Sequence, residues 1–246
     1  MNIENAVVLV TGANRGLGRA IVAAVLRRGA RRVYAGARDP SKLDSVVQLS
    51  PERVRPLPLD IASAESLAAA ALAAPDVEVL FNNAGVLASY DVITSSREEI
   101  AQDFAINFFG LVDTTKAFLP ALERAGSAGG AALVNVLSVV SLASVPELGA
   151  YSASKAAAFS ITQALRGRLL KKGVSVHGAF PGPIDTDMVR AMEMKKTDAD
   201  EVARAIVLGV EQGVEDISPD PVGQGALATW RRDPKLLERQ FASMFG

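Results

Sequence analysis

The sequence contains no cysteine, a single histidine and a single tryptophan, and only 5% of its 246 residues are aromatic. The absence of cysteine excludes disulfides and zinc–thiolate sites. One histidine cannot build a metal site or a catalytic triad, so we expect no bound metal, and we expect His177 to pack within an apolar strand. No segment approaches the roughly 20 consecutive apolar residues that span a bilayer.

An excess of charge of one sign is also lacking: 26 Lys and Arg stand against 27 Asp and Glu, a net charge of −1. A nucleic acid or an anionic membrane calls for a strongly basic surface, so neither is expected as a partner. The first residues lack a basic region followed by a long apolar stretch, so no signal peptide is predicted. Together with the absence of cysteine, this favours a cytoplasmic protein.

Short apolar runs alternate with longer helical patterns along the chain. Strands are predicted at residues 6–11, 32–37, 54–59, 77–82, 131–137 and 174–180. Helices are predicted at residues 15–28, 64–73, 97–123, 151–171, 198–212 and 233–245, and residues 215–223 as strand or loop. The strands are continuous Val, Leu and Ala runs, which is typical of strands covered on both faces.

This alternation predicts an α/β fold: a Rossmann-like, doubly wound parallel sheet between two layers of helices. We expect one domain over residues 1–246, because no linker or repeat interrupts the pattern. Residues 183–197 contain three of the five methionines and are interpreted as a short substrate lid. Residues 215–246 form the closing segment of the domain.

A glycine-rich turn connects the first predicted strand to the first predicted helix. It reads T-G-A-N-R-G-L-G over residues 11–18. Glycines let the backbone approach a pyrophosphate closely, and a helix N-terminus offers free N–H groups to an anion. The G-K-[ST] sequence of P-loop nucleoside triphosphatases is absent, so we predict that the turn binds a dinucleotide.

The tip of the second predicted strand indicates which dinucleotide binds. Ala37 stands where an acid would hold the ribose 2′-hydroxyl of NAD, and Arg38 follows it. Arg15 in the glycine turn is a second cation that could reach a 2′-phosphate, whereas Asp39 could serve a turn before Pro40. We therefore predict NADP(H) as the preferred cofactor, with NAD(H) as the alternative.

Tyr151 and Lys155 are separated by one helical turn, so their side chains share a face of the predicted helix. A phenol with a pKa of about 10 is a poor proton carrier at neutral pH, and a nearby ammonium lowers that pKa. The spacing alone is also common for surface pairs, so its interpretation depends on the rest of the chain.

Six motifs occur in one order along the chain: T-G-x-x-x-G-x-G at 11–18, N-N-A-G at 82–85, Asn107, Ser138, Y-x-x-x-K at 151–155 and P-G-x-x-x-T at 181–186. Over residues 5–187 the sequence strongly resembles the short-chain dehydrogenase/reductase family, in particular its carbonyl reductases. The family's closing strand, with its V-D-G-G sequence, has no counterpart here. The resemblance implies a homo-oligomer, and the missing strand favours a dimer over a tetramer.

The resemblance also implies catalytic roles. Tyr151 is expected to act as the general acid or base on the substrate oxygen. Lys155 is expected to lower the pKa of Tyr151 and to hydrogen-bond the nicotinamide ribose. Ser138 is expected to orient and polarise the substrate, and Asn107 to anchor a water that connects Lys155 with solvent.

The resemblance extends to the cofactor contacts and the substrate pocket. Besides Tyr151 and Lys155, the expected cofactor-binding residues are Gly12, Asn14, Arg15, Gly16, Leu17, Gly18, Arg38, Asp60, Ile61, Asn83, Ala84, Gly85, Pro181, Gly182, Ile184 and Thr186. The expected substrate pocket is apolar and comprises Leu87, Val140, Leu148, Met188 and Met192.

These features predict an NADP(H)-dependent oxidoreductase that acts on a small hydrophobic ketone, aldehyde or secondary alcohol. One alternative is a 3-oxoacyl-[acyl-carrier-protein] reductase, which would need a basic surface for its acidic carrier; Arg97, Lys195 and Lys196 are its only candidates. Another alternative is a catalytically silent NADP-binding sensor, which has no need of Ser138, Tyr151 and Lys155 together.

Overall fold

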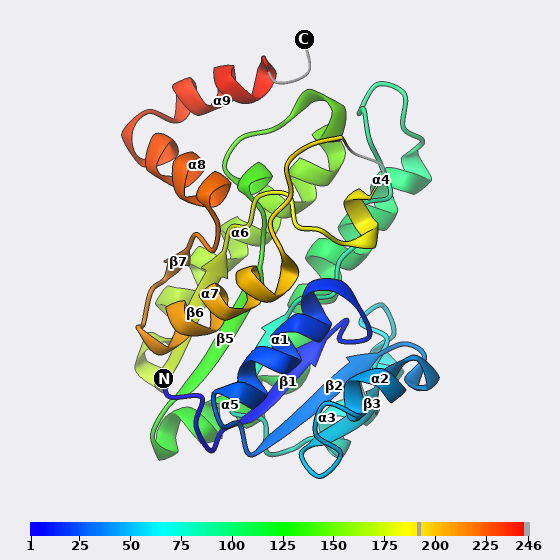
Figure 1. Ribbon diagram of the computed structural model, residues 1–246, viewed down its shortest axis with the longest axis vertical. Coiled ribbons are helices and arrows are strands. Elements are labelled where there is room, and N and C mark those ends of the chain that lie inside the picture. The colour runs from blue at the N-terminus through cyan, green and yellow to red at the C-terminus, as the bar shows by residue number, and fades with distance from the viewer. Residues whose placement is uncertain (191–192, 244–246) are drawn as a thin grey trace.

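The computed structural model of the chain describes residues 1–190 and 193–243, and Figure 1 shows its arrangement. Within these residues, parallel strands form one sheet in the order β3-β2-β1-β4-β5-β6-β7. Their bounds are β1 Val7–Thr11, β2 Arg32–Ala37, β3 Val54–Pro58, β4 Val79–Asn82, β5 Ala131–Val136, β6 Val174–Ala179 and β7 Asp216–Ile217. The predicted doubly wound parallel sheet is confirmed.

Helices cover both faces of this sheet. Their bounds are α1 Gly16–Arg27, α2 Asp44–Val47, α3 Ala64–Ala73, α4 Arg97–Phe104, α5 Leu111–Ala128, α6 Gly149–Leu169, α7 Ala199–Glu211, α8 Pro221–Arg232 and α9 Pro234–Ala242. The apolar faces of α1, α2 and α7 pack on one side, and those of α3, α5 and α6 on the other. Every residue of β1 and β5 is buried, as expected for strands covered on both faces.

The helix predicted over residues 97–123 is built from three parts. A π-helical segment, η2 (Ala105–Gly110), separates α4 from α5, and α5 continues past Pro120 to Ala128. Ser96 caps α4 through a capping box with Glu99. A π-helical turn shifts the side chains that follow it around the helix axis, and here it contains Asn107.

The sequence prediction missed α8. Residues 215–223 were expected to form a strand or loop, but only Asp216–Ile217 pair as β7 and a helix begins at Pro221. Asp220 caps this helix, and Pro221 occupies its first position, where a proline costs no hydrogen bond. Gly223 and Gly225 inside α8 obscured its helical pattern in the sequence.

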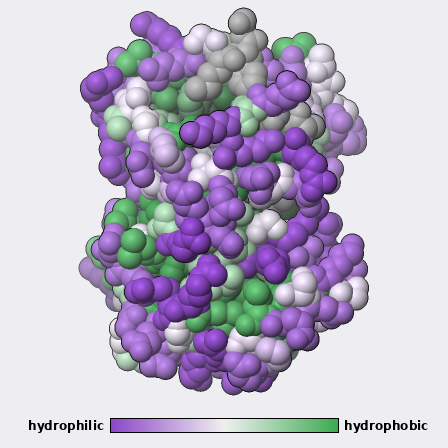
Figure 2. Space-filling model, viewed as in Figure 1, coloured by the Kyte–Doolittle hydropathy of each residue, from purple (hydrophilic) through white to green (hydrophobic). Residues whose placement is uncertain are grey.

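The surface agrees with this architecture. Figure 2 shows a face that is mainly hydrophilic, with apolar side chains in separate patches. Among the residues that the structure describes, we find no helix with the length and apolar character that crossing a membrane requires.

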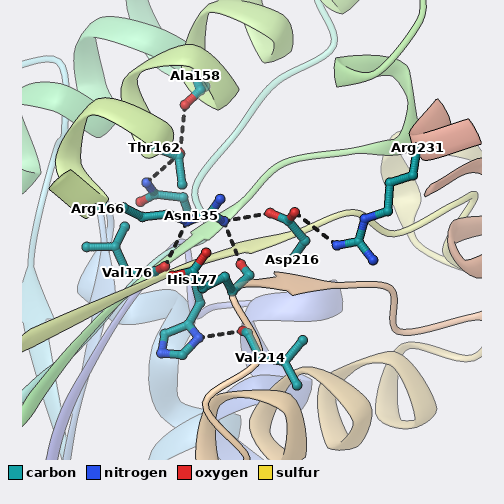
Figure 3. A network of polar contacts seen from close by, with 10 residues as sticks. Asn135, Ala158, Thr162, Arg166, Val176, His177, Val214, Asp216 and Arg231 are labelled. Atoms are coloured by element: carbon teal, nitrogen blue, oxygen red, sulfur yellow. Dashed lines mark hydrogen bonds and ion pairs between the residues drawn. The ribbon is translucent and has the colours of Figure 1, made fainter. Parts of the chain in front are cut away.

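His177 lies in the interior of β6, and its side chain is 1% exposed. Its Nδ1 is 2.7 Å from the carbonyl oxygen of Val214 (Figure 3). Its Nε2 is 2.9 Å from Oγ of Ser175. Burial disfavours the imidazolium and lowers the pKa of His177. The histidine therefore has the predicted strand-packing role and joins β6 to the segment before β7.

This burial makes the free energy of unfolding depend on pH. In the unfolded chain the histidine pKa is about 6.5, and in the folded protein it is lower. The unfolded state therefore binds the proton first, so the stabilisation is present above pH 6.5 or so and is lost as the pH falls. We expect His177→Gln to lose less stability than the parent protein between pH 7.5 and 5.5 in urea unfolding. Parallel pH curves for the two proteins would contradict this assignment.

Candidate active site

A cavity of about 760 Å³ runs along the edge of the sheet where the strands end. Because all the strands are parallel, the residues that follow β1, β4, β5 and β6 meet at this edge. The cavity also lies at the switch point between β1 and β4, where ligands bind in sheets of this topology.

The glycine turn after β1 forms one end of the cavity. Gly12 and Gly16 have φ angles of +65° and +51°, which side-chain-bearing residues rarely adopt. A Cβ atom on Gly18 would lie 2.1 Å from the carbonyl oxygen of Gly12. The backbone thus turns with no room for side chains and presents the start of α1 to the cavity, as a pyrophosphate cradle requires.

The turn after β4 is tied to the glycine turn. Oγ1 of Thr11 accepts hydrogen bonds from the backbone N–H groups of Asn83 (3.0 Å) and Ala84 (2.9 Å). The Asn83 side chain donates in return to the Thr11 carbonyl, at 2.8 Å. Asn82 lies behind it, buried between Thr115 and Asn135. Asn83 thus lines the cavity and also satisfies the backbone of its neighbour.

The part of the cavity next to the end of β2 carries two cations, and an acid there already has hydrogen-bond partners. Arg38 lines the cavity, and Lys42 joins it from the turn η1 (Pro40–Leu43). Asp39 accepts hydrogen bonds from the backbone and hydroxyl of Ser41, which lower the pKa of its carboxyl. Asp39 therefore caps the turn η1, which begins at Pro40. Lys42, which forms an ion pair with Asp39, is a lining cation that the sequence prediction missed.

Arg15 lines the cavity and forms an ion pair. Its guanidinium pairs with Asp187 at 3.0 Å, so it bridges the glycine turn and the segment after β6. This segment includes the short turn η6 (Asp187–Val189) and contacts the glycine turn directly, since a Cβ on Gly16 would lie 3.1 Å from Cγ2 of Thr186.

All of the predicted cofactor contacts line this one cavity. They are Gly12, Asn14, Arg15, Gly16, Leu17, Gly18, Arg38, Asp60, Ile61, Asn83, Ala84, Gly85, Tyr151, Lys155, Pro181, Gly182, Ile184 and Thr186. The three-dimensional fold thus gathers residues from six separate chain segments into a single groove.

Ser138, Tyr151 and Lys155 line the same cavity. Ser138 follows β5 and caps the turn η3 (Val139–Ser141), with Oγ 3.3 Å from the N–H of Val140. Nζ of Lys155 donates to the carbonyl of Val136 at 3.0 Å and lies 5.9 Å from the centre of the Tyr151 ring. The Tyr–Lys pair on α6 and the serine after β5 therefore face one space.

Asn107 stands behind this group and does not line the cavity. Its Oδ1 accepts from the N–H of Val86, and its Nδ2 donates to the Val86 carbonyl and to Oγ of Ser154. Each hydrogen of the amide thus has a protein partner. The Asn107 side chain thus positions the turn after β4 against α6.

Burial changes the pKa values of the pair in opposite directions. It raises the pKa of Tyr151, and the negative charge of Asp103 adds to this rise. It lowers the pKa of Lys155 to about 8, partly opposed by Asp103. In the protein without a ligand the net shift for Tyr151 is therefore upward, contrary to the expectation that Lys155 lowers it. Desolvation by burial is the larger cause of this rise.

The predicted substrate residues Leu87, Val140, Leu148 and Met188 also line the cavity, whereas Met192 lies outside the described residues. The sequence prediction missed two lining residues from the closing segment, Val222 and Phe241. The D-P pair at 220–221, a common helix start, was the signal that could have revealed α8.

Asp220 connects this segment to the site. Its carboxylate is 2% exposed and accepts 2.8 Å hydrogen bonds from the N–H groups of Gly182 and Gly223. A Cβ on Gly182 would lie 2.6 Å from Cβ of Val222. The loop after β6 and the start of α8 are thus in direct contact.

The doubly wound sheet, the pyrophosphate cradle and the Ser–Tyr–Lys group together define a nucleotide-binding oxidoreductase. A family model described as short chain dehydrogenase matches residues 6–197. The chain belongs to the short-chain dehydrogenase family.

Known relatives agree in length as well as fold. A short chain dehydrogenase from Burkholderia cenocepacia J2315, solved with NADP, is 36% identical with a TM-score of 0.90, over 98% of this chain and 99% of that one. A Burkholderia phymatum short chain dehydrogenase/reductase, solved with NAD, is 26% identical with a TM-score of 0.85, over 98% and 96%. An uncharacterized oxidoreductase of Staphylococcus aureus strain MW2 is 30% identical, over 89% of this chain and 99% of that protein.

The role of Asp220 can be tested by its removal. Asp220→Ala leaves the buried N–H of Gly182 without a partner and removes the cap of α8, so we expect a loss of about 2–4 kcal/mol of stability. The matched control is Asp198→Ala, which removes the exposed cap of α7 and should cost about 1 kcal/mol. Urea unfolding measures both changes. Equal losses for the two variants would show that the Gly182 contact contributes nothing.

Proposed function

We propose that the protein is an NADP(H)-dependent carbonyl reductase and alcohol dehydrogenase for hydrophobic ketones, aldehydes or secondary alcohols. The observation that carries this proposal is the position of Ser138 and Tyr151 in one cavity with the glycine cradle and with apolar side chains. The Leu87, Val140 and Leu148 side chains supply this apolar wall.

The chain's own residues can handle the proton. The Tyr151 hydroxyl donates its proton to the carbonyl oxygen during reduction and accepts it during oxidation. Because burial raises its pKa, the phenol stays protonated at neutral pH and is ready to donate. The Ser138 hydroxyl donates a hydrogen bond to the same oxygen and so orients the substrate.

Lys155 has a charge role in this site. With a pKa of about 8 it is mainly an ammonium at neutral pH, and it stabilises negative charge that develops on Tyr151 once the proton has left. A water held at Asn107 would connect Lys155 with solvent. When bound, the nicotinamide supplies or accepts the hydride on the substrate carbon.

A carbonyl panel tests the function and the role of Tyr151 together. We expect NADPH oxidation, followed at 340 nm, with hydrophobic ketones or aldehydes. In Tyr151→Phe the acid is missing, so we expect turnover to fall at least 10²-fold, with the dissociation constant of NADPH unchanged within about twofold. Near-normal turnover in this variant contradicts the assignment. Tight NADPH binding without turnover of any carbonyl by the parent protein would favour a silent sensor.

The preference for NADP(H) is supported by the adenosine end of the cavity. Arg38 and Lys42 line it, Ala37 stands at the end of β2, and the carboxylate of Asp39 is engaged by Ser41. Among residues 1–190 and 193–243, Arg38 has no ion-pair partner and can bind a phosphate without first losing one. The relative solved with NADP supports the same choice, and the one solved with NAD keeps NAD as the alternative.

Arg38→Ala separates the two cofactors. Loss of a charged hydrogen bond to the 2′-phosphate costs about 1.5–3 kcal/mol, so we expect the Kd of NADPH to rise at least tenfold and that of NADH to change less than twofold. Calorimetric titration measures both constants. Arg28→Ala is the control, since Arg28 pairs with Glu211 away from the cavity. A similar rise for both cofactors, or tighter binding of NADH by the parent protein, contradicts the preference.

A further inference from the structure

The closing segment reaches the substrate end of the cavity although it lies beyond the part of the chain that matches the family. The family match ends at residue 197, whereas β7, α8 and α9 lie between residues 216 and 242. Val222 on α8 and Phe241 on α9 line the cavity together with Tyr151. Figure 1 shows α9 at the far end of the molecule from α2 and α3, beside the segment that precedes α6.

A partly buried ionic contact fixes this segment to the core. Asp216 on β7 pairs with Arg166 on α6 at 2.7 Å and with Arg231 on α8 at 3.1 Å (Figure 3). Arg166 also donates to the main-chain carbonyls of Val176 and Glu215. The helix that carries Tyr151 and the helix that leads into α9 are thus held by one carboxylate.

Trp230 adds an aromatic contact between α8 and α6. It is partly buried, and its ring centre lies 5.8 Å from that of Phe159, which in turn meets Phe180 at 4.9 Å. Edge-to-face pairs of this kind favour one relative orientation of the helices. The orientation of α8 is therefore set by packing as well as by charge.

The inner face of α9 packs over the loop between β5 and α6. Leu237 and Phe241, one turn apart, are 1% and 4% exposed and contact Val139, Val140 and Val145. Tyr151 packs against the same cluster. Asp233 caps α9 at the N–H groups of Lys235 and Leu236, so the helix has a defined start. Of its two buried side chains, Phe241 lines the cavity and Leu237 does not.

We propose that Phe241 is a specificity-determining residue that limits the size of the carbonyl compound the cavity accepts. Its ring stands on a capped helix, belongs to the apolar cluster that Tyr151 packs against, and occupies space that a larger substituent of the substrate would need. The chemical class that fits is a compact apolar ketone or aldehyde. This inference rests on the function proposed above.

The test compares two ketones of the same chemistry and different size, acetophenone and benzophenone. In Phe241→Ala we expect the kcat/KM ratio of benzophenone to acetophenone to rise at least tenfold, because hydrophobic pockets discriminate on this scale by size. Phe241→Leu should give a smaller rise in the same direction. The matched control is Leu237→Ala, which opens the same cluster without lining the cavity and should keep the parent ratio within about twofold.

Binding supplies a second measurement that needs no turnover. Calorimetric titration of benzophenone into the protein loaded with NADP⁺ should give a Kd at least tenfold lower for Phe241→Ala than for the parent protein. If the parent reduces neither ketone, the proposed function fails, and calorimetry alone decides the role of Phe241. Equal changes in Phe241→Ala and Leu237→Ala, or no tighter binding of benzophenone in Phe241→Ala, would overturn the proposal.

Discussion

The site depends on backbone segments that approach each other too closely for side chains. Gly12 lies against the backbone of Ala84, where an added Cβ would meet Cα at 2.9 Å, and Gly18 lies against the carbonyl of Gly12. Thr11 bonds the two turns together through its hydroxyl. This contact joins the ends of β1 and β4 at the switch point, and the groove for a dinucleotide follows from it.

Buried polar groups fix the part of the cavity near Ser138 and Tyr151. Asn107 bonds the turn after β4 to α6, and Lys155 donates to the end of β5. Each satisfied group removes a desolvation cost and fixes one element against another. Desolvation also changes pKa values beside the cavity. Burial raises the pKa of Tyr151 and lowers the pKa of Lys155 to about 8. Asp103 contributes to both by charge and also holds the N–H groups of Ala88 and Ser89.

The closing segment adds one wall to the cavity, although it lies beyond the part of the chain that matches the family. The carboxylate of Asp216 on β7 pairs with Arg166 on α6 and with Arg231 on α8. The carboxylate of Asp220 joins the start of α8 to the backbone N–H of Gly182. On this support α9 presents Leu237 to the core and Phe241 to the cavity. The same cluster packs against Tyr151, so this wall and Tyr151 share one support.

The sequence by itself determined the sheet, the glycine cradle and the Tyr151–Lys155 pair, because these follow from local patterns: buried apolar runs, glycines at a turn, and one-turn helical spacing. The resemblance to a known family added Ser138 to this pair. Tertiary structure alone decided the partners of Arg15 and Asp39, the upward shift for Tyr151 and the place of Phe241 in the cavity. Each of these depends on residues distant in the chain or on burial. Contacts between distant residues and burial leave no periodic signal in the sequence, because charge pairing and desolvation are set only when the segments pack together.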